Sequence, residues 1–196
     1  MLFYHSTSSK NKNKIIKSSM IVPTKFDITK YLDVILPNFD GTLKVPEIVK
    51  GQRMVPYLGE GVYCFDNYNS AASYQVNNDV VTIEYDDKCE KIDLDNPIFL
   101  IKLDNYLNEE FDDELNKKFL DEDVKLGYKV LKNTILYYIY DEKNFEKVFP
   151  QMFAIIIFLL YDFRNKEEPD VFFRKFSVCD SPYFVIKNER KIESLC

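Results

Sequence analysis

The amino-acid sequence predicts an α+β fold whose sheet is assembled from both ends of the chain. Segments rich in β-branched and aromatic residues occur near the amino end, between residues 62 and 103, and again after residue 171. Such segments are typical of strands. Between residues 105 and 163 the apolar residues recur at helical spacing instead. Strands toward both ends with helices between them are the order expected of an α+β protein.

The amino-terminal part is predicted to combine short regular elements with irregular chain. Residues 1–5 have strand composition and stop at the polar residues 6–9, which suit a turn or a helix cap. Residues 13–19 are expected to form a helix. Four prolines within residues 23–58 favour loops and short helices there.

More regular structure follows these prolines. Asp66 and Asn67 are turn-forming residues, so a helix is expected over residues 70–75, with Ala71, Ala72 and Tyr74 close to the core. Strands are expected at residues 62–65, 80–85 and 97–103.

The middle of the chain is predicted to be helical. Acidic residues dominate residues 105–123. Apolar residues recur there at helical spacing, as in an amphipathic helix with a solvated acidic face, and they are Phe111, Leu115, Phe119 and Leu120. Further helices are expected at residues 126–140 and 150–163, and late strands at 171–176 and 183–186. We therefore expect one domain over residues 1–196 with a mainly helical insertion at about residues 105–165.

Composition and charge exclude several classes of protein. The chain is 46% hydrophobic and 15% aromatic, which is ample for a packed core. Its net charge of -6 gives no overall attraction for nucleic acid or for an anionic membrane, and the lysines of residues 10–17 suit a solvated face. The apolar run at 152–161 is shorter than the roughly 20 residues of a membrane span. Because the start also lacks the order of a secretory signal, we expect a cytoplasmic protein without a membrane partner.

Cysteine and histidine content limits the chemistry further. The four cysteines lie far apart without a CxxC pair, and His5 is the sole histidine. This argues against a disulfide framework, a metal site and a Ser-His-Asp triad. Any histidine chemistry must therefore occur at His5. The alternative is a histidine that only caps or packs at a strand end.

Two segments together resemble the diphtheria-toxin and poly(ADP-ribose) polymerase branch of the ADP-ribosyltransferase superfamily. They are LFYHSTSS at the amino end and, some fifty residues later, GEGVYCFDNYNSAASY. In that branch a first strand ends in His-Gly-Ser or His-Gly-Thr. A second segment carries Gly-x-Gly-x-Tyr-Phe, and a helix of small residues ending in Tyr follows it. His5-Ser6-Thr7 matches the first with Ser in place of Gly, and the chain matches the second from Gly59 to Tyr63.

The resemblance implies a split mixed sheet with a helical insertion, and NAD as the substrate. His5 would hydrogen-bond the nicotinamide-side ribose, and the rings of Tyr63 and Tyr74 would stack on the two faces of the nicotinamide. The main chain of Ser6 would hold the carboxamide. The other cofactor-binding positions would be Thr7, Gly61 and Ser70. In the alternative reading Tyr63 and Tyr74 are ordinary core aromatics.

The chain departs from the family at two positions. The family's nicotinamide-binding serine aligns with Ala71, one place after Ser70. The family's catalytic glutamate opens a late strand, and here Pro182 stands in its place. A carboxylate there stabilises the reacting ribose and serves as a base. Asp180 is the first candidate to replace it, ahead of Glu189 and Glu193. The catalytic residues expected from the resemblance are therefore His5, Tyr63 and Asp180.

These observations favour an NAD-dependent mono-ADP-ribosyltransferase that adds at most one ADP-ribose per acceptor site. By analogy it would be a bacterial or phage toxin or defence effector, with a protein or nucleic-acid acceptor and a neutralising antitoxin as partners. The alternative is a non-catalytic module that keeps the fold as a binding surface. A weaker alternative is an RNA phosphotransferase of the same fold, which relies on several arginines around its histidine. This chain has only four arginines, at positions 53, 164, 174 and 190.

Overall fold

The computed structural model describes residues 1–29, 58–75, 78–140, 150–175 and 181–196. It divides into two compact units. The first is β-rich and contains Met1–Lys25, Glu60–Asp95 and Glu168–Cys196, and the second is helical and contains Phe26–Gly59 and Asn96–Glu167. The predicted α+β class is confirmed. The description as a single domain with an inserted helical segment stays a prediction.

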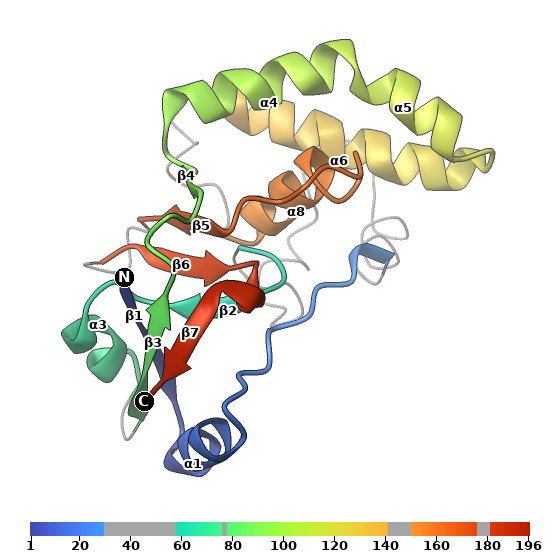
Figure 1. The fold of residues 1–196 in the computed structure, drawn as a ribbon. Helices are drawn as coiled ribbons and strands as arrows, with labels where there is room; N and C mark the ends of the chain where they lie inside the picture. The colour runs from blue at the N-terminus through green and yellow to red at the C-terminus, as the bar shows by residue number, and fades with distance from the viewer. Residues whose placement is uncertain (30–57, 76–77, 141–149, 176–180) are drawn as a thin grey trace. The chain divides into compact units, whose positions relative to one another are not determined.

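The β-rich unit contains two sheets, and strands from both ends of the chain build the first (Figure 1). This sheet is antiparallel and has the order β1-β3-β7. The second has the order β2-β6-β5-β4 and is mixed, because β4 and β5 run parallel. The strands are β1 (Leu2–Thr7), β2 (Val62–Cys64), β3 (Asp79–Tyr85), β4 (Lys91–Asp93), β5 (Val171–Arg174), β6 (Tyr183–Ile186) and β7 (Ile192–Leu195).

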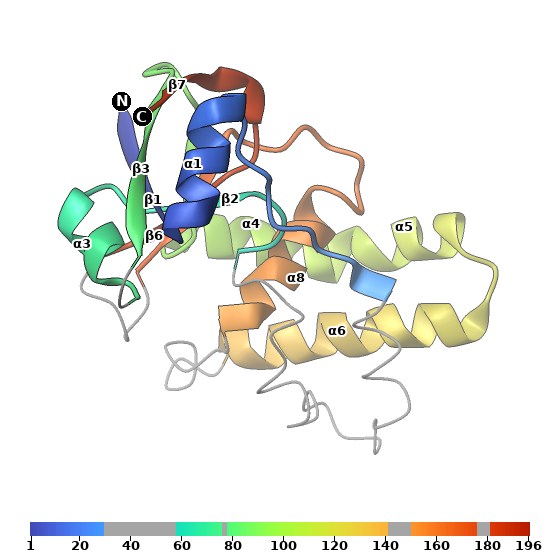
Figure 2. The same cartoon turned by 90° about the horizontal axis from the view of Figure 1, so that it is seen from below.

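Two helices lie on opposite sides of the β1-β3-β7 sheet (Figure 2). The helix α1 (Ser9–Ser18) buries Ile15 in the cluster that contains Phe3, Val81 and Ile83. On the other side, α3 (Tyr68–Ser73) places the ring of Tyr68 edge-on against Tyr4, with 5.9 Å between ring centroids. Since residues i and i+2 of a strand point to the same side, His5 shares the α1 side with Phe3.

Capping residues explain where the helices begin. The side chain of Ser8 accepts a hydrogen bond from the Asn11 N–H, so α1 starts before the predicted residue 13. Asn67 caps α3 by accepting from the Ser70 N–H at 2.8 Å. Asn96 likewise accepts from the Ile98 N–H at 2.9 Å. Each cap satisfies a main-chain donor that the first turn of a helix leaves without a partner.

The predicted strand at residues 97–103 is wrong, because these residues begin the helix α4 (Pro97–Glu109). Proline in the first turn directly after the Asn96 cap favours a helix start, since its missing N–H is not needed there. The buried residues of α4 are Phe99, Leu103, Tyr106 and Leu107, which is helical and not alternating spacing.

The helical unit packs α4 and α5 (Phe111–Lys118) along α6 (Glu122–Tyr140), together with α8 (Pro150–Leu160) (Figure 1). The single helix predicted at 105–123 is wrong, because the end of α4, the whole of α5 and the start of α6 share that range. Aromatic rings fill the core between them, and Arg164 lies 4.1 Å from the ring centroid of Tyr106. Among the described residues, no helix has both the length and the apolar character to cross a membrane.

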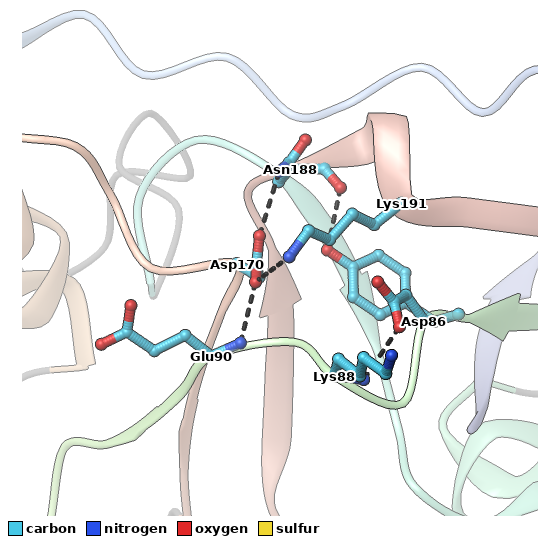
Figure 3. A network of polar contacts seen from close by, with 7 residues as sticks. Asp86, Lys88, Glu90, Asp170, Asn188 and Lys191 are labelled. Atoms are coloured by element: carbon cyan, nitrogen blue, oxygen red, sulfur yellow. Dashed lines mark hydrogen bonds and ion pairs between the residues drawn. The ribbon is translucent and has the colours of Figure 1, made fainter.

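A buried aspartate joins segments that are far apart in sequence within the β-rich unit (Figure 3). The carboxylate of Asp170, 7% exposed, accepts hydrogen bonds from the Glu90 N–H at 2.8 Å, from Asn188 Nδ2 at 3.0 Å and from Lys191 Nζ at 2.8 Å. The hydroxyl of Tyr85 donates to the Asn188 carbonyl at 2.8 Å. This network ties together the chain before β4, the chain before β5 and the segment between β6 and β7.

Candidate functional site

The two segments that resemble the family meet where the two sheets adjoin. Tyr4 and Phe65 exchange two main-chain hydrogen bonds of 2.9 Å, which form an isolated bridge between β1 and β2. Thr24 and Gly61 form a second isolated bridge at the other end of β2. We call the region between these bridges, around His5, Ser6 and Tyr63, the β1–β2 split. The strands β1 and β2 thus belong to different sheets, which the Tyr4–Phe65 bridge joins.

The side chain of His5 adds a further direct contact between the two motifs. Its Nδ1 lies 2.7 Å from the main-chain oxygen of Tyr63. A carbonyl oxygen can only accept, so Nδ1 carries the proton and Nε2 of the neutral ring is an acceptor. Burial lowers the pKa of His5, and the hydrogen bond to the Tyr63 carbonyl offsets only part of that effect. The neutral ring with an accepting Nε2 is therefore the form present at neutral pH.

Ser6 presents main-chain groups to the β1–β2 split. Tyr4 directs its N–H and C=O toward Phe65, and alternation along a strand directs those of Ser6 to the same edge. The isolated bridge ends before Ser6, and the Tyr63 carbonyl opposite is used by His5. Within the described residues we find no main-chain partner for Ser6 at this edge. Its hydroxyl accepts from Asn78 Nδ2 at 3.0 Å, and Thr7 is buried at the end of β1.

The two predicted stacking tyrosines have different surroundings. Tyr74 follows α3, is 43% exposed, and packs its ring on Phe65 at 5.4 Å and on Tyr183 at 5.6 Å between centroids. Tyr63 is half-buried in β2 and, by alternation, shares the side of Phe65. Tyr63 and Tyr74 thus lie on the same side of β2. The ring of His5, in contrast, contacts the main-chain oxygen of Tyr63 and not its side chain.

Ser70 is joined to the segment that precedes β6. Its hydroxyl lies 2.6 Å from the hydroxyl of Ser181, which also accepts from Asn67 Nδ2 at 2.8 Å. Sequence reasoning identified Ser70 but missed Asn67 and Ser181 as its partners. The helix-cap signal of Asn67 was visible in the sequence, but nothing local indicates that Ser181 lies beside it.

Gly61 is required by the packing of β2 against β6. Its φ is +142°, and a Cβ there would lie 2.5 Å from the main-chain oxygen of Ile186 and 2.6 Å from Val185 Cγ2. A glycine therefore lets the two strands approach each other. The resemblance implied a cofactor-binding position at Gly61, and the close approach described here is to the protein's own main chain.

Replacing Gly61 by alanine is expected to lower the free energy of unfolding by about 2 to 4 kcal/mol, because the methyl group clashes with a main-chain atom and the backbone conformation is unfavourable for it. Urea denaturation measures this change. Ala72→Gly, at an exposed position in α3, is the control and should cost about 1 kcal/mol or less. Equal losses in the two variants would contradict the importance of the close approach at Gly61.

The carboxylates proposed from the sequence are distributed as follows. Glu189 and Glu193 are exposed, the first in a single 3₁₀ turn after β6 and the second in β7. Pro182 immediately precedes β6, which pairs with β2. Asp180 lies outside the described residues. Among those that are described, no group of three or more histidine, cysteine, aspartate or glutamate side chains could hold a metal ion.

Comparison with known proteins identifies no relative of this chain. No family model, no curated protein and no solved structure matches it significantly. The resemblance to ADP-ribosyltransferases therefore stays a prediction, which has to be judged on the residues and geometry described above.

Proposed function

We propose that this protein is an NAD-dependent mono-ADP-ribosyltransferase whose active site lies at the β1–β2 split. The observation that carries the proposal is the hydrogen bond from His5 Nδ1 to the Tyr63 carbonyl. It brings together two motifs that are separated by more than fifty residues. It also leaves Nε2 as an acceptor, which is the atom that a ribose hydroxyl needs.

The Ser6 edge supports the same assignment. A carboxamide has one acceptor oxygen and an NH₂ donor, so it can pair with the N–H and C=O of one residue in the manner of a neighbouring strand. Ser6 presents that pair of groups beside His5. Because the pairing uses only main-chain atoms, serine can replace the glycine of the family motif here.

A ligand bound at the edge between two strands can contact both sides of the sheet. A ligand in the β1–β2 split could therefore contact His5 on one side of the strands and Tyr63 and Tyr74 on the other. In the proposed complex the two tyrosine rings stack on the nicotinamide, for which contacts of roughly 0.5 to 2 kcal/mol are typical. Holding the ribose and the ring promotes cleavage of the bond between them, provided that the contacts strengthen as positive charge develops on the ribose.

Pro182 in place of the glutamate supports transfer of a single ADP-ribose. Elongation requires a base that activates a hydroxyl of the ribose already attached, and proline supplies none. Asp180 remains the first candidate for a replacement carboxylate. We further propose action in the cytoplasm as a toxin or defence effector, with an antitoxin as its partner, by analogy with small proteins of this type.

A non-catalytic binding module is the second candidate. The absence of glutamate at position 182 favours it, and so does the Ser70 hydroxyl, which already pairs with Ser181. Incubation with labelled NAD and cell lysate separates the two functions. Label in one ADP-ribose unit per site supports the transferase, whereas NAD binding without transfer supports the module.

Binding of NAD should raise the melting temperature, and Tyr74→Ala should remove the rise. A ligand at about 100 times its Kd adds about 2.7 kcal/mol to the free energy of unfolding. In a chain of this size that corresponds to roughly 5 to 10 °C. The matched control is Tyr68→Ala, which removes another exposed tyrosine of the same region, 56% exposed, and should keep the rise. Loss of the rise in both variants, or in neither, would contradict the stacking role of Tyr74.

A further inference from the structure

Basic residues are segregated at the amino-terminal end of this acidic protein. The first 25 residues contain five of the 26 basic residues and none of the 32 acidic ones. Four of the five are lysines of α1, at positions 10, 12, 14 and 17. The chain as a whole repels polyanions, so a local surface of opposite sign is the place where one could bind.

Three of these lysines form one face of α1. Lys10, Lys14 and Lys17 follow the i, i+4, i+7 spacing of a single helical face, and all three are exposed. Ile15, which packs in the core, lies on the opposite side of the helix. The three ammonium groups therefore point away from the sheet, over a rise of about 10 Å along the helix axis. We call this set the α1 lysine face.

Carboxylates of the described residues do not neutralise the charges of the α1 lysine face. In the described part of the chain, none of its three lysines forms an ion pair with a carboxylate, in contrast to Lys25, Lys132 and Lys191. The first turn of α1 has no acidic residue, although an acidic one would stabilise it. The positive end of the helix dipole and the charge of Lys10 thus add to one another, whereas Lys17 lies in the last turn, where a basic residue stabilises the helix.

The chemistry of the surface fits a phosphate backbone better than a protein or a membrane. Between the lysines the face carries Asn13, and Ser9, Asn11, Ser18 and Ser19 surround it. Lysine, serine and asparagine are typical phosphate contacts. Protein interfaces have cores depleted in lysine, and helices that lie on membranes have a broad apolar face. In α1, Ile16 is the only exposed apolar residue.

We propose that the α1 lysine face binds the phosphate backbone of nucleic acid. α1 begins two residues after β1 and covers the side of the β1-β3-β7 sheet to which His5 belongs (Figure 2). A bound strand would therefore lie along the outer surface of α1, on the same side of the sheet as His5. Binding at the α1 lysine face would make nucleic acid the class of acceptor. This step rests on the proposed function.

The test compares two triple variants of the full chain with equal change in charge. K10E/K14E/K17E removes the α1 lysine face. K102E/K117E/K166E changes three exposed lysines of the helical unit, none of which has an ion pair within the described residues. Fluorescence anisotropy measures binding of labelled single-stranded DNA, single-stranded RNA and duplex DNA without NAD, between about 50 and 200 mM salt. Circular dichroism and melting temperature confirm that both variants are folded.

We expect the first variant to bind at least one of these nucleic acids about tenfold or more weakly than wild type, with a salt dependence smaller by about two units of slope, as three lost phosphate contacts imply. The second variant should bind like wild type. No binding by the wild type at low salt, equal losses in both variants, or equally tight binding to polyglutamate or anionic vesicles would overturn the proposal. The binding measurement contains no NAD. Nucleic-acid binding without any transfer of ADP-ribose would therefore contradict the proposed function but not the binding role of the α1 lysine face.

Discussion

Replacing His5 by alanine is expected to reduce ADP-ribose transfer by about 100-fold or more, because the acceptor for the ribose hydroxyl is lost where charge develops in the reaction. The measurement is transfer of label from NAD into lysate fractions, together with release of nicotinamide. Activity equal to wild type in His5→Ala would overturn the assignment of the β1–β2 split as the active site.

A second variant distinguishes a chemical role of His5 from a structural one. In His5→Asn the amide NH₂ stands near the place of Nδ1 and can still donate to the Tyr63 carbonyl, but no atom replaces Nε2. We expect this variant to keep the wild-type melting temperature within a few degrees and to be as inactive as His5→Ala. Activity retained in His5→Asn would show that only the link between β1 and β2 matters.

Replacing Asp170 by asparagine is expected to lower the free energy of unfolding by about 2 to 4 kcal/mol. Three donors point at the buried carboxylate, from Glu90, Asn188 and Lys191. An amide has only one acceptor oxygen, so in either orientation its NH₂ group faces at least one of these donors. Denaturation in urea gives the change. Glu90→Gln is the matched control, because it removes one exposed negative charge and retains the main-chain donor to Asp170.

The same network should make the protein sensitive to acid. Burial raises the pKa of Asp170, but hydrogen bonds from Lys191, Glu90 and Asn188 and the charge of Lys191 outweigh it, so the pKa is lower than usual. A carboxylate with a lowered pKa in the folded state stabilises the protein above its unfolded value of about 3.9, and that contribution is lost as the pH falls below it. The difference in stability between wild type and Asp170→Asn should therefore shrink below about pH 4. A constant difference from neutral pH to pH 3 would contradict this account.

Local sequence patterns predicted many of the elements of the β-rich unit. The strands at 62–65, 80–85 and 183–186 are apolar and bounded by polar or turn-forming residues, and each appears within a residue of its expected place. Residues 97–103 were predicted wrongly because IFLI suits a buried strand or a buried helix equally well. There the Asn96 cap and Pro97 decide in favour of a helix.

Features that depend on distant pairing could not be predicted in this way. The strands β4 and β7 contain charged residues and have little strand signal of their own, so their partners β5 and β3 define them. The Ser70–Ser181 contact results from how segments far apart in sequence align. The same holds for the edge of Ser6, which has no main-chain partner among the described residues. His5, Tyr63 and Tyr74 were identified by resemblance. The geometry adds that, among the described residues, His5 Nε2 and the main-chain N–H and C=O of Ser6 have no protein partner.

The order of the segments also bears on synthesis of the protein. The β-rich unit is discontinuous, since its last segment begins at Glu168 and supplies β5, β6 and β7, whereas most of the helical unit is one run of chain. During translation the helices can fold as soon as they emerge, because their contacts are local. β2 has no β6 to pair with until residues 183–186 have left the ribosome. A chain without residues 183–186 would therefore lack the support of Tyr63 and Gly61, and the proposed activity would be absent until these residues have been made.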